Sequence, residues 1–318
     1  MWTAITLWLV LGGGTLAYIG WAATKVGAGA PAWPFVVGLP LLYLALILFS
    51  TLLYFALAWG FRAPRPEHAR IGRMHTVRLI WREFRTIAGS APRMMLYRWL
   101  VPEPAPAPAA LPVLLLHGVL CNAGVWTRMK RHLDAEDLGP VYALSYGPPL
   151  ASIESFADQT AARIDAILAA TGARQVVLVA HSMGGLVARS YLRRHGGGRV
   201  ARVVTIGTPH AGSVHSWLFP GVSLAQMHPG NPWLRELARP ADHAPMPPMV
   251  SVWSWHDSMV APQISSRIAD GDNLELTGVG HNALLSDPEV FARVAEQIRI
   301  ARAAAARAST EPATAAAA

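Results

Sequence analysis

Charge is scarce in this sequence, and cysteine is almost absent. Charged residues make up 14% of the 318 positions and apolar residues 53%, a balance that excludes a disordered or purely solvating chain. Cys121 is the one cysteine, which excludes an internal disulfide and a cluster of thiolate metal ligands. Because Cys121 follows an apolar segment at an expected turn, we interpret it as a small half-buried residue rather than as a reactive thiol.

The lack of charge is concentrated at the start of the chain. Residues 1–61 contain a single charged side chain, Lys25, between two apolar stretches at residues 3–23 and 35–59. Each stretch is long enough to cross a hydrocarbon layer as a helix. A signal peptide is the alternative for the first stretch, but that stretch is too long and no Lys or Arg precedes it. We therefore predict a two-helix transmembrane hairpin at residues 1–61.

Positive charge follows this hairpin directly. Residues 62–100 hold nine arginines against two glutamates, whereas residues 101–318 have 17 basic and 17 acidic side chains. A basic strip beside an apolar segment suits anionic lipid headgroups better than phosphates of nucleic acid, so we expect membrane lipid and no nucleic acid as a partner. The positive-inside rule then predicts a multi-pass membrane protein with its catalytic domain on the cytoplasmic side.

The basic strip also contains apolar residues at helical spacing. This pattern predicts a juxtamembrane helical segment at residues 62–100 that lies along the membrane surface or packs on the catalytic domain. Prolines at 102, 104, 106, 108 and 112 predict an extended linker at residues 101–112. Residues 113–306 should form the catalytic domain, and residues 307–318 an alanine-rich tail that is expected to be disordered.

Short β-branched runs alternate with longer helical patterns in the catalytic part. This alternation is typical of a mostly parallel, doubly wound α/β sheet covered by helices. The expected strands lie at residues 113–117, 141–145, 176–181, 202–207, 249–253 and 273–277. The expected helices lie at residues 152–171, 183–195 and 287–306.

The strongest chemical signal is a serine at an abrupt change from strand to helix. The apolar run at 176–181 stops at Ala180-His181-Ser182-Met183-Gly184, which is the pattern of a nucleophile elbow. Its turn requires small residues on both sides of the serine, and Ala180 and Gly184 meet that requirement. Ser182 is therefore the predicted nucleophile, and the backbone N–H of Met183 is one predicted oxyanion donor.

A second oxyanion donor should come from the loop after an earlier strand. The run Leu114-Leu115-Leu116 ends in His117-Gly118, so the N–H of Val119 is our candidate and that of Leu120 is the alternative. His117 precedes the elbow at the end of a strand, which favours a role in shaping this loop over a role as the base.

The base and acid should follow the nucleophile in the order Asp, then His. His281 lies in a glycine-rich loop after the last expected strand, and Asp257 lies just beyond the preceding strand. Asp270 and Asp272 belong to an expected turn, and Asp287 has the position of a helix N-cap. The histidines at 195, 210, 215, 228, 243 and 256 show no ligand-like grouping, so we expect neither a metal nor another cofactor.

These motifs resemble those of a known family. Ala180-His181-Ser182-Met183-Gly184-Gly185, Gly207-Thr208-Pro209-His210-Ala211-Gly212-Ser213 and Gly278-Val279-Gly280-His281 resemble the small bacterial triacylglycerol lipases and esterases of the α/β-hydrolase superfamily, over residues 112–300. The resemblance implies an α/β-hydrolase fold behind two transmembrane helices and a triad of Ser182, Asp257 with Val260 in an Asp-x-x-Val context, and His281. Two membrane spans and a basic strip depart from those lipases and argue against an extracellular role.

The substrate is indicated by an insertion between Pro209 and Met249. It is rich in Pro, His and Trp and shows no strand pattern, as expected of a lid or acyl pocket. We predict that Leu120, Trp217, Phe219 and Trp233 bind substrate, and that the chain cleaves lipid-like or medium-chain carboxylic esters through an acyl-enzyme on Ser182. The alternatives are an acyltransferase on the same fold and a catalytically silent interaction module on a membrane anchor.

Overall fold

In the residues that the structure describes, a six-stranded parallel sheet organises the second part of the chain. The computed structural model describes residues 2–239, 246–269 and 271–310. Six strands follow the order β2-β1-β3-β4-β5-β6, and every neighbouring pair is parallel. The strands are β1 (Val113–Leu116), β2 (Val141–Leu144), β3 (Val176–His181), β4 (Val200–Ile206), β5 (Met249–Ser254) and β6 (Asp272–Leu276). All six predicted strands are confirmed, with small shifts at their ends.

The strand order creates a crevice at the carboxyl edge of the sheet. β1 lies between β2 and β3 although it precedes both, so the chain leaves β1 first to one side and then returns to the other. In open parallel sheets, ligands bind at such a reversal, outside the carboxyl ends of the strands. Leu116 at the end of β1 is in register with Ala180 near the end of β3. The segments that follow these two strands therefore meet at the crevice.

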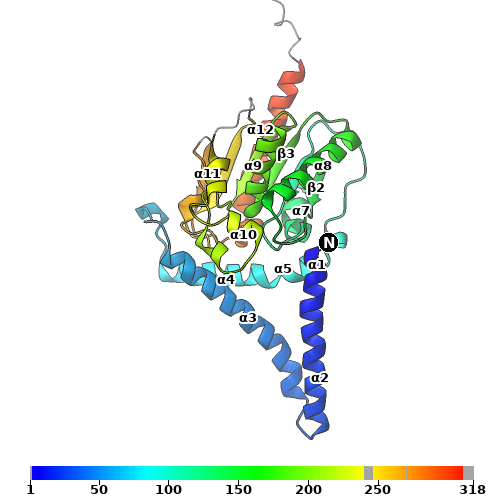
Figure 1. Cartoon of the computed structure of the whole chain (residues 1–318), viewed down its shortest axis with the longest axis vertical. Helices are drawn as coiled ribbons and strands as arrows, with labels where there is room; N and C mark the ends of the chain where they lie inside the picture. Colours follow the sequence, from blue (N-terminus) through cyan, green and yellow to red (C-terminus); the bar gives the residue numbers. More distant parts are fainter. Residues whose placement is uncertain (1, 240–245, 270, 311–318) are drawn as a thin grey trace, which may run out of the picture.

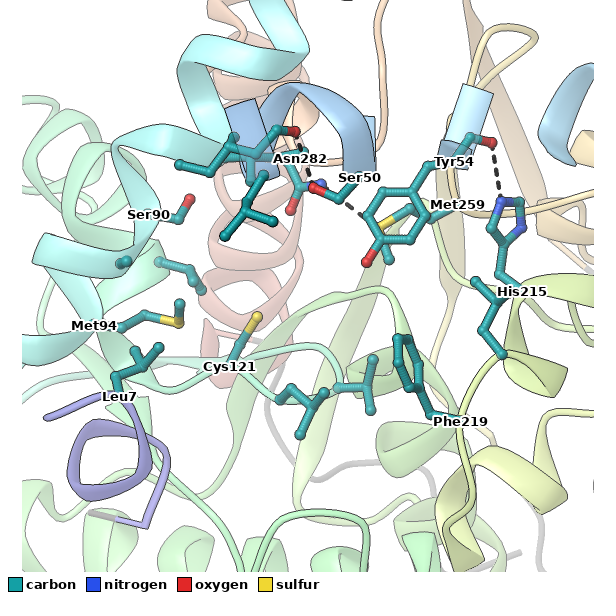
Figure 2. A pocket seen from close by; sticks show the side chains of 18 of the residues that line it. Leu7, Ser50, Tyr54, Ser90, Met94, Cys121, His215, Phe219, Met259 and Asn282 are labelled. Carbon is teal, nitrogen blue, oxygen red and sulfur yellow. Dashed lines mark hydrogen bonds between the residues drawn. The ribbon is translucent and has the colours of Figure 1, made fainter. Parts of the chain in front are cut away.

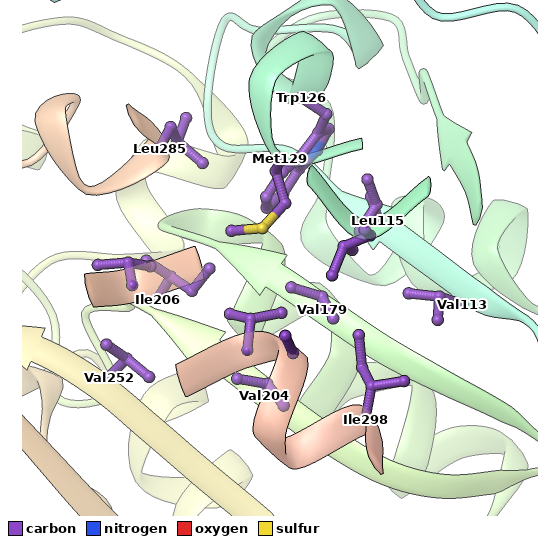
Figure 3. Packing of buried hydrophobic residues seen from close by; sticks show 14 of the residues in the cluster. Val113, Leu115, Trp126, Met129, Val179, Val204, Ile206, Val252, Leu285 and Ile298 are labelled. Atoms are coloured by element: carbon purple, nitrogen blue, oxygen red, sulfur yellow. The ribbon is translucent and has the colours of Figure 1, made fainter. Parts of the chain in front are cut away.

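Helices cover both faces of the sheet. The larger ones are α7 (Thr127–Ala135), α8 (Ile153–Thr171), α9 (Met183–His195) and α12 (Pro288–Thr310). On one face, Val113 and Val179 pack against Met129 of α7 and Ile298 of α12 (Figure 3). The alternate strand residues, such as Leu178, pack with α8 and α9 on the other face. Strand residues alternate between the two faces because side chains of a β-strand point in opposite directions in turn.

The expected helices over residues 152–171, 183–195 and 287–306 are confirmed, and local chemistry explains their bounds. The Ser152 side chain accepts a hydrogen bond from the Glu154 N–H at the start of α8, and Gly172, with φ of 69°, ends that helix. Asp287 accepts from the N–H of Glu289 at the start of α12, as expected of an N-cap. Helix α12 continues to Thr310, so the first residues of the alanine-rich tail are helical; alanine has the highest helix propensity.

Short helical elements fill the loops. They are η3 (Ala123–Trp126), η4 (Val214–Trp217), α10 (Val222–Gln226), α11 (Pro232–Ala238), η5 (Gln263–Ser266) and η6 (Ala283–Ser286). The insertion between β4 and β5 contains η4, α10 and α11 and no strand in its described residues. Its residues 240–245, which include His243, lie outside the described residues. The linker at residues 101–112 contains neither helix nor strand.

The N-terminal helices project away from the sheet as a hairpin. They are α1 (Trp2–Leu7), a π-helical stretch η1 (Trp8–Gly12), α2 (Gly13–Gly27) and α3 (Trp33–Gly60). The stretches Trp2–Gly27 and Trp33–Gly60 are long and apolar enough to cross a membrane, with mean hydropathies of 1.4 and 2.4. Only 11% and 6% of their most apolar windows are buried, unlike core helices of soluble proteins. Both outer ends of the hairpin reach the α/β part, and its turn points away (Figure 1).

The basic segment lies between the hairpin and the α/β part. It contains η2 (Glu67–Ala69), α4 (Arg73–Ala88), α5 (Ser90–Met95) and α6 (Tyr97–Leu100), and α4 and α5 run crosswise to the hairpin (Figure 1). One face of α4 exposes Met74, Val77 and Trp81, which are 64%, 61% and 57% exposed. The opposite face buries Leu79 and Glu83. Helix α4 thus packs on the α/β part and presents a second apolar face outward.

Candidate active site

Ser182 lies on a strained turn between β3 and α9. Its φ of 56° and ψ of −129° are rare for any residue with a side chain, and its N–H donates to Ile206 O in the next strand at 2.9 Å. Close packing explains why glycine follows at position 184. A Cβ there would lie 2.7 Å from His117 O and closer still to Leu116 O. The first turn of α9 therefore approaches the end of β1 in a way that only glycine permits.

The loop after β1 lies directly against this serine. A Cβ added at Gly118 would be 2.9 Å from Ser182 Cβ and 3.3 Å from its Oγ, and the neighbouring Val119 lines the same cavity as Ser182. Leu120 follows with a φ of 55°. His117 is buried, its Nδ1 lies 2.8 Å from Gly118 O and its ring stacks on Tyr146. Burial lowers the pKa of His117 to about 4, so a neutral His117 packs within the loop.

His281 and Asp257 meet close to His181, the residue that precedes the serine. Nδ1 of His281 lies 2.9 Å from Oδ2 of Asp257, and both side chains are almost fully buried. Oδ1 of Asp257 accepts from the N–H groups of Met259 and Val260 at 2.8 and 2.7 Å. A carboxylate held in this way orients the imidazole, and because Nδ1 is occupied, Nε2 is the ring nitrogen left to accept a proton.

The surroundings of His281 favour its protonated form. Burial by itself lowers the pKa of the imidazole, but the charge of Asp257, its hydrogen bond and the charge of Glu83 raise it, and the resulting pKa is above the ordinary 6.5. His181, next to the serine, packs its ring 4.6 Å from that of His281. Burial lowers the pKa of His181 well below its usual value, so a neutral ring donates from Nε2 to His281 O at 3.2 Å.

The other residues considered for these roles lie elsewhere. Asp272 is exposed at the start of β6, and Asp287 pairs with Arg82 at 2.6 Å while it caps α12. Asp270 is outside the described residues. Burial raises the pKa of Cys121 to about 12, which makes a reactive thiolate unfavourable. The described part of the chain holds no group of three or more His, Cys, Asp or Glu side chains that could bind a metal ion.

A large apolar cavity adjoins Ser182. Its volume is about 820 Å³, and its walls come from the hairpin, from α5 and from the α/β part. Figure 2 shows Leu7 of α1, Met94 of α5, Tyr54 of α3 and Phe219 of the insertion around the same space. The residues from the hairpin are Leu7, Val10, Leu11, Gly14, Tyr18, Leu39, Leu42, Tyr43, Leu46, Ile47, Ser50 and Tyr54.

The predicted substrate-binding residues divide into two groups. Leu120 and Phe219 line the cavity, as does Val119 of the predicted oxyanion loop. Trp217 is 58% exposed and packs against His228, outside the cavity lining. Trp233 packs with the core on the α8 and α9 side of the sheet. The sequence showed only that Trp233 belongs to an apolar insertion. The folded structure shows that Trp233 is partly buried against the core on the α8 and α9 side of the sheet.

Glu83 contacts the candidate site, and sequence reasoning did not single it out. This carboxylate comes from α4, is fully buried and binds the loop that carries His281. In the sequence it is one of two acidic residues among nine arginines. Such a charged composition is typical of a solvent-exposed surface. The available signal was its spacing of four from the apolar Leu79, since residues i and i+4 share a helix face.

Comparisons with known proteins bear on the fold. A family model described as the alpha/beta hydrolase fold matches residues 112–246. The chain has the α/β-hydrolase fold. A triacylglycerol lipase of Pseudarthrobacter phenanthrenivorans is 50% identical over 56 residues, which are 18% of this chain and 17% of that lipase. A triacylglycerol lipase of Burkholderia plantarii matches at the same identity and length, over 15% of its own chain. The matched segment thus spans about a sixth of these curated relatives.

Solved structures support the same fold. The mature form of a Bacillus licheniformis lipase superposes with a TM-score of 0.54 at 19% identity, over 62% of this chain and 95% of that lipase. Lipase B of Aspergillus fumigatus gives a TM-score of 0.54 at 20% identity, over 60% of this chain and 52% of its own. The expected resemblance of this chain to lipases and esterases is therefore confirmed, and the fold is that of the predicted class.

Proposed function

We propose that this α/β-hydrolase is a membrane-anchored serine hydrolase that cleaves carboxylic esters. The observation that carries the proposal is the buried His281–Asp257 pair at 2.9 Å beside a serine in a strained turn. A neutral imidazole held by a carboxylate is the arrangement that activates a serine hydroxyl. The lipase relatives support ester cleavage as the chemistry.

The proposed reaction proceeds through an acyl-enzyme. Ser182 Oγ attacks the ester carbonyl while His281 Nε2 takes its proton, and the resulting oxyanion accepts hydrogen bonds from the N–H groups of Val119 and Met183. Collapse of this intermediate breaks the ester bond, and the departing alcohol oxygen takes the proton from His281. Water then attacks the acyl-enzyme with His281 as base. Collapse of this second intermediate breaks the bond to Ser182 Oγ, which takes the proton back from His281, and the carboxylic acid is released. Asp257 stabilises the imidazolium in both halves of the reaction.

We further propose that the two apolar helices cross the membrane. Their length, their hydropathy and their small buried fraction suit lipid as a surrounding. Thr3 Oγ1 donates to Cys121 O at 2.9 Å, and His215 Nε2 donates to Tyr54 O at 3.1 Å. These contacts tie both outer ends of the hairpin to the α/β-hydrolase part, which supports a retained anchor over a removed signal sequence. With Lys25 alone near the turn, the charge distribution favours the cytoplasm for the catalytic side.

Helix α4 would then lie at the membrane surface. It runs crosswise to the hairpin at the level where the hairpin meets the α/β-hydrolase part (Figure 1). Its outward face combines the apolar Met74, Val77 and Trp81 with the exposed Arg78 and Arg85. A basic and apolar face is what binds an interface of anionic lipid. The substrate class that fits this location and the apolar cavity is a lipid-like or medium-chain ester.

Labelling with a fluorophosphonate probe tests the proposed nucleophile and its location together. We expect the full chain in membranes to be labelled and its Ser182→Ala variant to remain unlabelled, because only an activated serine reacts with the probe. A charged, membrane-impermeant probe should label vesicles that expose the cytoplasmic face and spare vesicles of the opposite orientation. Labelling of the alanine variant at the wild-type rate would refute the nucleophile, and the reversed vesicle pattern would refute the orientation.

A further inference from the structure

The cavity beside Ser182 continues deep into the space between the two apolar helices. Helices α2 and α3 meet near the hairpin turn and separate toward the α/β-hydrolase part (Figure 1). Two side chains join the two apolar stretches, at different distances from the hairpin turn. Tyr18 of α2 donates its hydroxyl to Phe35 O at 3.1 Å, and Tyr43 of α3 donates to Leu11 O at 3.0 Å. The cavity lining reaches from Tyr18 and Leu39 to Ser182.

The length and polarity of the cavity match a lipid chain. The α3 residues that line it run from Leu39 to Tyr54, which is about 22 Å at the rise of a helix. One leaflet of a bilayer core is about 15 Å deep, so the lined length accommodates a complete acyl chain. Most of the lining side chains are aliphatic or aromatic, and they offer such a chain the apolar surroundings that it has in the bilayer.

We propose that the two membrane helices form the acyl-chain site of the enzyme, with the chain of a membrane lipid ester lying between α2 and α3 and its carbonyl at Ser182. This inference rests on the proposed ester hydrolysis. The hairpin then has two roles. It anchors the protein, and it forms the part of the substrate site that selects for the length of the acyl chain. A lipid enters between the helices from the bilayer without transfer of its chain through water, which is unfavourable for each methylene exposed.

Narrowing the cavity from within the membrane tests this site. Leu46 lines the cavity, whereas Leu44 is on the same helix and outside the lining. We expect Leu46→Trp in the full chain, reconstituted in phosphatidylcholine vesicles, to lower kcat/KM for a sixteen-carbon p-nitrophenyl ester by about 10-fold or more. The rate on the four-carbon ester should remain within about two-fold, because a short chain does not reach residue 46. The matched Leu44→Trp variant should behave as wild type on both esters.

Each outcome of this comparison decides between the chain site and the proposed function. Equal long-to-short rate ratios for wild type, Leu46→Trp and Leu44→Trp would refute the chain site, and so would an equal loss on both esters by Leu46→Trp. If wild type hydrolysed neither ester, the proposed function would fail instead. A variant of Leu39, nearer the hairpin turn, extends the test. Leu39→Trp should lower kcat/KM for the sixteen-carbon ester and leave kcat/KM for an eight-carbon ester unchanged. Leu46→Trp should lower kcat/KM for both of these esters.

A second inference concerns Glu83, and it rests on different contacts. Oε1 of this fully buried carboxylate accepts from Ser258 Oγ at 2.7 Å and from the Asn282 backbone N–H at 2.9 Å. Oε2 accepts from the N–H of Ala283 at 2.9 Å. Ser258 Oγ in turn accepts from the N–H of His281 at 3.3 Å. One side chain of α4 therefore binds the residue after Asp257 and the two residues after His281.

We infer that Glu83 is a positioning residue for the base and acid loops. The fit is close, since a Cβ at Gly280 would lie 2.5 Å from Glu83 Oε2. A buried carboxylate is retained only where hydrogen bonds compensate its loss of water, and here the donors belong to the loops that carry the proposed triad. Through Glu83, the helix that we place at the membrane surface takes part in holding His281 against Asp257. This inference also depends on the proposed function.

The pH profile separates positioning from general stability. We expect Glu83→Gln to lower kcat/KM on a four-carbon ester by about 10- to 100-fold. The base must be neutral to act, so kcat/KM of wild type rises with pH through the pKa of His281, which is raised above 6.5. Because the charge of Glu83 contributes to that raised pKa, the rising limb of Glu83→Gln should move to lower pH. Glu67→Gln, an exposed acid of the same basic segment, is the matched control and should change neither quantity.

A second variant keeps the inference testable if Glu83→Gln does not fold. Ser258→Ala removes the hydroxyl between Glu83 and the His281 N–H while the other hydrogen bonds of the carboxylate remain. It should lower kcat by about 3- to 10-fold with little change in KM, as expected when an interaction matters for the chemical step. A folded Glu83→Gln variant with a wild-type rate and pH profile, or an unaffected Ser258→Ala variant, would overturn the role of Glu83.

Discussion

Replacement of Ser182 by alanine is expected to lower kcat on a carboxylic ester by roughly 10⁵- to 10⁶-fold. The loss is large because in the proposed mechanism the hydroxyl forms the covalent intermediate, and neither His281 nor the backbone donors can substitute for it. Asp257→Asn should lower kcat by about 10⁴-fold, since an amide no longer holds the imidazole in the tautomer that exposes Nε2. Steady-state kinetics on a soluble four-carbon ester measures both effects without dependence on the cavity between the apolar helices.

The double variant gives the sharper result. If Ser182, His281 and Asp257 act as one unit, Ser182→Ala combined with Asp257→Asn should be no slower than Ser182→Ala alone. Additive losses would instead mean that the two residues act independently. Asp272→Asn serves as the control, because this carboxylate is exposed at the far end of its strand. Its rate should remain within about two-fold of wild type, and a large loss there would contradict the assignment of the acid to Asp257.

Gly184→Ala is expected to damage both stability and activity. A Cβ at this position would lie 2.7 Å from His117 O, so the elbow and the end of β1 must separate. Overpacking against backbone costs about 1–3 kcal/mol or more, and each kcal/mol lowers Tm by about 2–4 °C in a domain of this size. We expect Tm to fall by about 5–10 °C and kcat/KM to fall by about 10²-fold, because Ser182 moves relative to its oxyanion donors.

Gly198→Ala is the matched control for that variant. A Cβ at Gly198 would meet no atom within 4 Å, so Tm and kcat/KM should both stay close to wild type. Thermal unfolding in detergent and ester kinetics on the same samples provide the two measurements. Equal Tm values for the Gly184 and Gly198 variants would show that the close approach of α9 to β1 does not constrain the elbow.

The sheet and the position of its functional edge followed from the sequence. Six apolar runs alternated with helical patterns, and this order predicts a parallel sheet whose carboxyl ends share one edge. Ser182, Asp257 and His281 each follow such a run, so the sequence predicted that they would meet. Helix α7 was not predicted, because its short segment Thr127–Ala135 is rich in charge and shows only Met129 and Leu133 as apolar anchors.

The sequence by itself determined the α/β-hydrolase class, the candidate nucleophile, base and acid, and the apolar and basic character of the first 100 residues. These features are local: they depend on the period of apolar residues, on turn chemistry and on the charge of adjacent segments. Only the tertiary structure decided that Glu83 binds Asn282 and Ala283, that Trp233 packs into the core, and that the two apolar helices share a cavity with Ser182. Contacts between segments so distant in the chain depend on the rotation and spacing of helices in the folded state. Composition and periodicity predict neither the rotation nor the spacing.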